Sequence, residues 1–154
     1  MTMHYRFIAA QFLAPILLLL IAGGASAADC DAPPATVRPG SAAGLSGSAT
    51  AFAGTWQGQW PVAVKDHVEP ICARLYVQIS SATTATVEHC TGSNPGARLR
   101  PECKRYAAEV NSNVMTFTDA KGTVFTFTMA DVGGMEAEAV NAEHRSGTVF
   151  TKVQ

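Results

Sequence analysis

The chain has 154 residues, 15% of them charged, and a formal net charge of −1 at pH 7. A nucleic-acid-binding domain usually carries a clear excess of basic residues, so this balance argues against nucleic acid as a partner. No G-x-S-x-G motif occurs, and Glu136 and Glu138 alternate as they would on the solvent face of a strand. We therefore expect no enzymatic activity and no cofactor.

The first 27 residues have the three parts of a secretory signal peptide. Arg6 supplies a positive charge, residues 7–22 are almost wholly apolar, and Ala25-Ser26-Ala27 matches an A-x-A cleavage site. The apolar run is shorter than the ~20 residues that a membrane-spanning helix needs. We expect cleavage after Ala27, membrane contact only through this removed segment, and a periplasmic or secreted mature protein.

All four cysteines follow the expected cleavage site. An even number of cysteines in an oxidising compartment indicates two disulfides, and no C-x-x-C pair suggests redox or zinc chemistry. Cys90–Cys103 is favoured because it would close the Gly-, Pro- and Ser-rich loop of residues 91–102. Cys30–Cys72 would then tie the N-terminal segment to the sheet. Cys72–Cys90, across a hairpin, is the rival pairing.

The composition changes near residue 50. Residues 28–50 are rich in Pro, Ala, Gly and Ser and predict a flexible linker. Residues 51–154 contain short β-branched and aromatic runs separated by turn residues, a pattern typical of an all-β sandwich or barrel. A polar loop is expected over residues 61–70. The expected strands are residues 52–60, 71–80, 84–90, 104–110, 114–118, 123–129, 135–140 and 148–153.

Short connections containing Asn, Asp or Gly predict that successive strands pair antiparallel. Within residues 71–79, the apolar side chains of Ile71, Ala73, Leu75, Val77 and Ile79 alternate with the others, as in a half-buried strand. An open sheet of eight strands would leave two unpaired edges, which closure removes. The predicted domain is an eight-stranded antiparallel up-and-down β-barrel over residues 51–154, with an open β-sandwich as the alternative.

Two short motifs resemble the lipocalin and avidin superfamily, the calycins. Gly54-Thr55-Trp56 matches the Gly-x-Trp of their first strand. Residues 147–153 resemble their closing strand, which carries a basic residue near that Trp, here Lys152 or Arg145. The resemblance, shared with small exported lipocalin-like domains of bacteria, implies a closed barrel. The helix before the last strand of full lipocalins is absent from the sequence pattern, and two tryptophans are too few for an avidin-type biotin pocket.

Candidate ligand contacts are two aromatic and two basic residues. Trp60 approaches the end of its strand and Tyr106 shares a face with core positions, so both are placed at the barrel mouth. Arg98 and Arg100 lie in the loop that Cys90–Cys103 would close, where they would attract an anionic group. Trp56 is expected to plug one end of the barrel, with its ring stacked by a basic residue.

The histidines suggest no metal site. His67 and Glu69 are spaced to share a strand face, but His67, His89 and His144 are interpreted as scattered surface residues.

The leading hypothesis is an exported, non-enzymatic barrel that binds a small apolar or amphipathic ligand, including an anionic one, in a pocket of at least ~300 Å³. The alternative is a protein-interaction module, such as an inhibitor of a lytic enzyme or protease. It would bind a periplasmic protein through residues 91–102 or 31–50.

Overall fold

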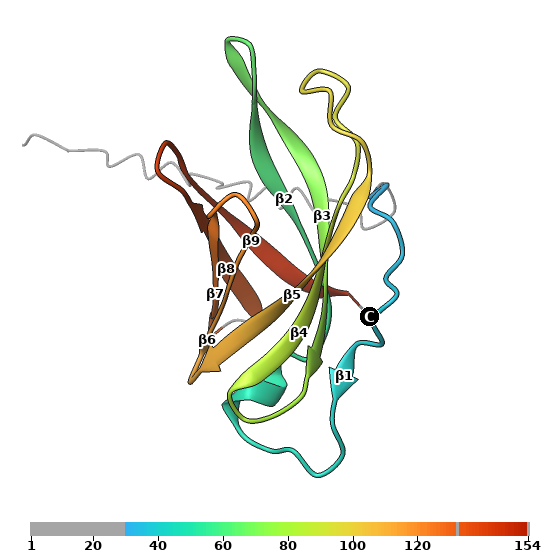
Figure 1. Ribbon diagram of the computed structural model, residues 1–154, viewed down its shortest axis with the longest axis vertical. Helices are drawn as coiled ribbons and strands as arrows, with labels where there is room; N and C mark the ends of the chain where they lie inside the picture. Colours follow the sequence, from blue (N-terminus) through green and yellow to red (C-terminus); the bar gives the residue numbers. More distant parts are fainter. Residues whose placement is uncertain (1–29, 132, 154) are drawn as a thin grey trace, which may run out of the picture.

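A computed structural model describes residues 30–131 and 133–153 (Figure 1). The strands of its main sheet are β2 (Gly54–Val64), β3 (His67–Ile79), β4 (Thr84–Thr91), β5 (Glu102–Asn111), β6 (Val114–Thr118), β7 (Val124–Met129), β8 (Gly134–Val140) and β9 (Arg145–Val153). Each strand pairs antiparallel with the next, and β2 also pairs with β9. The sheet is therefore a closed eight-stranded up-and-down barrel, as predicted, and the open sandwich is wrong.

The expected polar loop over residues 61–70 is also wrong. The β2–β3 ladder continues without interruption to Val64 opposite His67, so that residues 65 and 66 alone form the turn. Pro61 lies opposite Pro70 in this ladder. Two prolines fit face to face because half of the pairs in an antiparallel ladder exchange no hydrogen bonds. This stretch is therefore a projecting hairpin and not a loop, and on β2 the inward alternation of Trp60 continues to Val62 and Val64.

The barrel core follows the period-two pattern of the sequence. On β3, the five alternating apolar residues from Ile71 to Ile79 are each no more than 3% exposed. Inward positions of the other strands complete the same cluster, because every second side chain of a strand points to one face. The residues that the other strands contribute to this core cluster include Trp56, Trp60, Ala85, Val87, Ala108, Val110, Met115, Phe117, Phe127, Met135, Ala137 and Phe150.

One end of the barrel is plugged. The short 3₁₀ helix η2 (Ser48–Phe52) lies at the lower end in Figure 1 and buries Ala49 and Phe52 in the core. The Trp56 indole is 1% exposed, and its Nε1–H donates to the Phe52 carbonyl at 2.8 Å. The Lys152 ammonium lies 5.3 Å from the centroid of the Trp56 ring, within the range of a cation–π contact. Indole, helix and ammonium together seal this end.

The two favoured disulfides, Cys90–Cys103 and Cys30–Cys72, are both present. Cys90 and Cys103 are direct neighbours on β4 and β5, so this bridge joins two paired strands at the start of the loop that it closes. Cys30–Cys72 anchors the N-terminal segment to the outside of β3. The framework inferred from the cysteine count is therefore confirmed.

Residues 30–37, which we call the strap, lie against the outer face of the barrel, and the following β1 (Gly40–Ser41) pairs parallel with the end of β3. Ala32 packs with Tyr76 and Cys90 in a second small apolar cluster. Glu88 is buried, with 4% of the residue exposed. Its carboxylate accepts hydrogen bonds from the Thr36 and Val37 amides at 3.0 and 2.8 Å. The composition of residues 28–50 gave no sign of these contacts, because their partners lie on β3 and β4.

Gly58 sets how closely β2 and β9 approach. A Cβ placed there would lie 2.8 Å from both the Phe150 ring and the Val149 carbonyl, whereas one at Gly147 would meet its nearest neighbour at 3.7 Å. We predict that Gly58→Ala lowers the free energy of unfolding by about 1–3 kcal/mol through overpacking. Gly147→Ala, the control, should change it by less than about 0.5 kcal/mol. Urea unfolding measures both, and equal effects would refute this account of Gly58.

The strap depends on Glu88. Burial raises the pKa of this carboxyl, but hydrogen bonds from Val37 and Thr36 and the nearby Arg105 outweigh burial and lower it. We predict that Glu88→Gln destabilises the fold by about 1–2 kcal/mol, because an amide replaces one acceptor oxygen with a donor. Hydrogen exchange at the Thr36 and Val37 amides should accelerate in this variant and stay unchanged in Glu109→Gln on the exposed face of β5. Unaltered protection in Glu88→Gln would contradict the prediction.

Candidate functional site

The other end of the barrel holds a pocket of about 280 Å³ that opens to solvent. In Figure 1 this is the upper end, to which the β2–β3 hairpin and the loop after β4 extend, opposite η2. The deeper lining is apolar and aromatic, and the rim carries both signs of charge. The deeper lining includes Trp60, Ile71, His89, Tyr106 and Phe125, and the rim includes Glu102, Lys104, Asp119 and Lys121.

Aromatic rings from five strands pack together at the pocket. Trp60, His89, Tyr106 and Phe125 line it, and Phe117 packs against three of these rings. The rings of Tyr106, Phe117 and Phe125 are nearly parallel, with successive centroids 4.6 and 5.0 Å apart. Trp60 meets Phe125 edge-on at 5.7 Å, and His89 meets it at 5.3 Å. All five residues occupy inward positions of their strands, so their side chains share the barrel interior. The result is an apolar surface of packed rings that a ligand can cover.

His89 is the polar group within this cluster. Its Nε2 accepts a hydrogen bond from the Trp60 Nε1–H at 3.1 Å. Burial, the largest influence, lowers the pKa of His89 to about 4. The ring is therefore neutral at neutral pH. Its interpretation as a surface residue was wrong, although the sequence held the signal: Ala85 and Val87 are core residues, and His89 continues their alternation.

The rim provides ionic groups without a strong net charge. The Lys104 Nζ lies 2.9 Å from Glu102 Oε1. On the β6–β7 turn, Asp119 Oδ1 accepts from the Lys121 and Thr123 amides at 2.8 and 2.9 Å, which fixes the turn beside the mouth. A ligand with an apolar body and a polar end would therefore meet rings inside the pocket and charges at its opening.

The predicted contact residues divide into two groups. Trp60 and Tyr106 both line the pocket, whereas Arg98 and Arg100 are exposed on the loop and do not contribute to the lining. Leu99 between them does line the pocket. A role of the two arginines in binding stays a prediction.

A buried residue explains where the loop goes. Asn94, 4% exposed, donates from Nδ2 to Glu69 Oε2 at 3.0 Å and accepts from the Ala97 amide at 2.8 Å. The loop therefore packs against the β2–β3 hairpin. Sequence reasoning missed Asn94 because a lone Asn in a Gly/Pro/Ser-rich stretch is an ordinary turn residue.

The pocket also reaches the seam between β2 and β9. These strands pair over four residue pairs, from Thr55–Val153 to Gly58–Phe150. Beyond them the Thr148 hydroxyl still donates to the Gln59 carbonyl at 2.6 Å. Further toward the mouth, Pro61 of β2 and Ser146 of β9 both line the pocket. The end of the ladder therefore lies at the border of the pocket.

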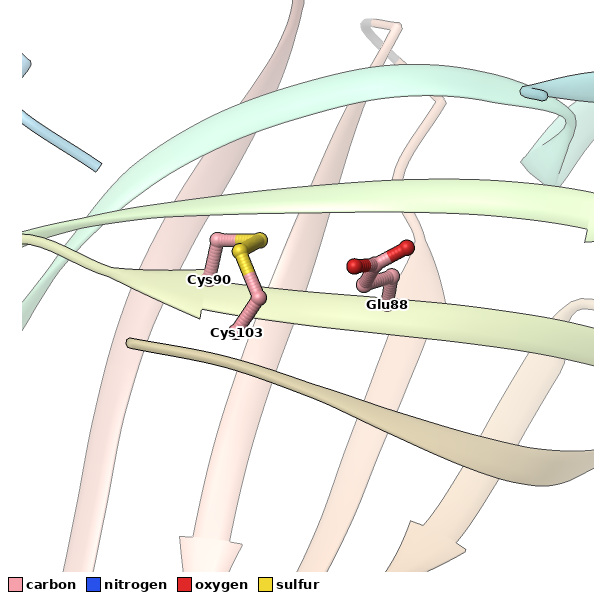
Figure 2. A group of neighbouring side chains, drawn as sticks. All are labelled: Glu88, Cys90 and Cys103. Atoms are coloured by element: carbon pink, nitrogen blue, oxygen red, sulfur yellow. A yellow bond between two sulfur atoms is a disulfide. The ribbon is translucent and has the colours of Figure 1, made fainter. Parts of the chain in front are cut away.

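A cluster of possible metal ligands on the outer face does not form a metal centre. One ligand atom from each of Glu88, Cys90 and Cys103 lies within 4.8 Å of the others. Figure 2 shows the two sulfurs joined in the disulfide, beside the Glu88 carboxylate. Disulfide sulfur is not the thiolate that metals require, and Glu88 already binds the strap. His67 and Glu69 share a face, but they hydrogen-bond to each other at 2.8 Å.

Fold and pocket together define a class: a closed antiparallel β-barrel with one plugged and one open end. No protein-family model matches the chain. No curated protein matches it either. Among solved structures, it is similar to a designed protein described as a de novo fluorescence-activating beta barrel, with 18% identity, a TM-score of 0.49, and coverage of 71% of this chain and 100% of the designed one. The eight-stranded antiparallel barrel that the calycin resemblance implied is present in the strand order of the chain itself, and no bacterial lipocalin family is identified.

The depressed pKa of His89 predicts a pH-dependent stability. In the unfolded chain His89 binds a proton below its ordinary pKa of 6.5. In the folded protein the buried ring stays neutral until the pH falls to about 4. The stabilisation is therefore complete above pH 6.5 and is lost as the pH falls toward 4. From pH 7.5 to 4.5 we expect the native protein to lose about 2 kcal/mol more than His89→Gln, less than the full shift because the ring is partly exposed.

Urea unfolding at the two pH values measures this difference. His144→Gln, at an exposed position of the β8–β9 turn, should behave like the native protein. Equal losses in all three proteins would show that His89 titrates normally.

Proposed function

We propose that this protein is an exported, non-enzymatic barrel that binds a small amphipathic ligand in its open end. The observation that carries the proposal is the contrast between the two ends. Phe52, Trp56 and η2 fill one end, whereas packed rings at the other border a solvent-open pocket. A barrel of eight strands is just wide enough to be filled by side chains or to hold one small ligand.

The pocket's size and lining define the ligand class. Sites for drug-sized molecules usually measure ~300–1,000 Å³, so about 280 Å³ suits a ligand at or below the small limit of this range. The apolar part would lie on the rings around Trp60 and Phe125. A polar or anionic end would lie at the rim near Lys104 and Lys121. Trp60 and Tyr106 are the proposed contacts from the interior, and Arg98 and Arg100 would act from the neighbouring loop at longer range.

Two features support export to the periplasm or beyond. Both disulfides belong to an oxidising compartment. The expected signal peptide, residues 1–27, lies outside the described residues and supports export through its sequence. In the described part of the chain, no helix has the length and apolar character needed to cross a bilayer.

A protein partner is the second candidate. The loop of residues 92–101 exposes Arg98, Leu99 and Arg100 beside the mouth, and the Cys90–Cys103 bridge holds both of its ends. Because Leu99 also lines the pocket, a partner docked on this loop would cover the opening. An inhibitor of a lytic enzyme or protease would use such a constrained, exposed loop.

Filling the pocket tests the leading proposal. Ala139 of β8 lines the pocket, whereas Ala107 of β5 points to the exposed outer face. With anilinonaphthalene sulfonate, an amphipathic dye, we expect one saturable site on the native protein, at least tenfold weaker binding to Ala139→Phe, and unchanged binding to Ala107→Phe. Tenfold corresponds to about 1.4 kcal/mol.

Fluorescence titration measures the affinities, and a cooperative unfolding transition in each variant excludes dye binding to a loosely packed state. No saturable binding by the native protein, or equal binding by both variants, would overturn the proposal.

A further inference from the structure

We infer that His89 sets the ligand preference of the pocket by donating a hydrogen bond from Nδ1 to an uncharged oxygen, such as a ketone or amide carbonyl, on a planar apolar ligand. The inference rests on the proposed function, since it requires the pocket to hold a small molecule. It adds the chemical group that is recognised and the residue that recognises it.

The contact with Trp60 fixes the proton of the imidazole. An indole N–H can only donate a hydrogen bond, so the His89 Nε2 that it meets at 3.1 Å must be an unprotonated acceptor. In a neutral imidazole the proton is then on Nδ1. Trp60 thereby turns the other side of the His89 ring into a donor.

The Nδ1 atom is free to meet a ligand. In the described part of the chain it has no hydrogen-bond partner, and the bond to Trp60 uses the other nitrogen. Among the described residues, every side-chain nitrogen or oxygen that is fully shielded from solvent has a hydrogen-bond partner. His89 is half-buried, so its unpartnered Nδ1 is accessible and not sealed in the core. Because the residue lines the pocket, this access is through the pocket.

The surroundings favour an uncharged acceptor on a flat ligand. The His89 ring lies among Trp60, Phe117 and Phe125, with centroids 5.3–6.3 Å away. Lys104, opposite His89 on β5, already has its ammonium 2.9 Å from Glu102, and Asp119 also lines the pocket. A carboxylate or phosphate placed among the rings would therefore lose its hydration and meet carboxylates as well as this paired cation. A carbonyl loses far less. Flat apolar rings stack or pack edge-on with such aromatic surfaces, so the ligand body should be planar.

The donor imposes selectivity because it must be satisfied. A ligand with an acceptor gives the Nδ1–H a hydrogen-bond partner in place of solvent, whereas one without an acceptor leaves the N–H buried and unpaired. A hydrogen bond of this kind should change affinity by about five- to tenfold.

A pair of ligands with the same shape tests this inference. 2-Acetylnaphthalene carries a carbonyl where 2-isopropenylnaphthalene carries a methylene group that cannot accept a hydrogen bond. We expect the native protein to bind the ketone about five- to tenfold more tightly, by displacement of the dye or by calorimetry. In His89→Phe the preference should vanish while the hydrocarbon keeps its affinity within about threefold. His144→Phe, the control outside the pocket, should retain the native preference.

Nitrogen NMR of the native protein gives a readout that needs no variant. The His89 signals should show the neutral Nδ1–H tautomer at pH 7, and the Nδ1 signal should shift with the ketone and not with the hydrocarbon. An Nε2–H tautomer would overturn the inference.

The binding outcomes separate the two proposals. If both ligands bind the native protein equally, or if His89→Phe keeps the preference, the inference fails and the binding function stands. If neither ligand nor the dye binds, the proposed function fails, and the inference fails with it.

Discussion

The short ladder between β2 and β9 is the contact on which the rest of the structure depends. Four residue pairs close the sheet, with the bare backbone of Gly58 against the Phe150 ring. Closure gives every inward side chain a common interior. Beyond Gly58 the β2–β9 ladder ends, and residues further along both strands, Pro61 and Ser146, line the pocket at the open end.

Alternation within strands made most of the fold predictable. The strand from residue 71 to 79 was readable because a period of two has one physical cause, the opposite orientation of successive side chains. The same reasoning placed Trp60 and Tyr106 where the pocket lies. It failed over residues 61–70, where the hairpin extends past the main core and its turn and outer face are polar. On β2, Val62 and Val64 nevertheless continue the inward alternation of Trp60, and Val64 is 5% exposed.

Contacts between distant segments decide what the sequence alone left open at the site. For Arg98 and Arg100, charge and loop position were all that the sequence offered, whereas the path of their loop depends on Asn94 meeting Glu69 of β3. His89 was overlooked for the opposite reason. Its strand pattern was readable, but histidine is usually a surface residue, and that expectation prevailed over its inward position. For His89, the alternation of its strand indicates the correct inward position, whereas the usual surface location of histidine indicates the wrong one.

The outer face supports the pocket from behind. Cys90 follows His89 on β4, and Cys103 precedes Lys104 on β5, and the two cysteines are paired across the ladder. Because successive side chains point to opposite faces, the disulfide lies outside the barrel at the level where His89 and Lys104 point inward. Glu88, on the same outer face, holds the strap over this part of the wall. The disulfide and two polar side chains that line the pocket, His89 and Lys104, thus lie on opposite faces of the same two strands.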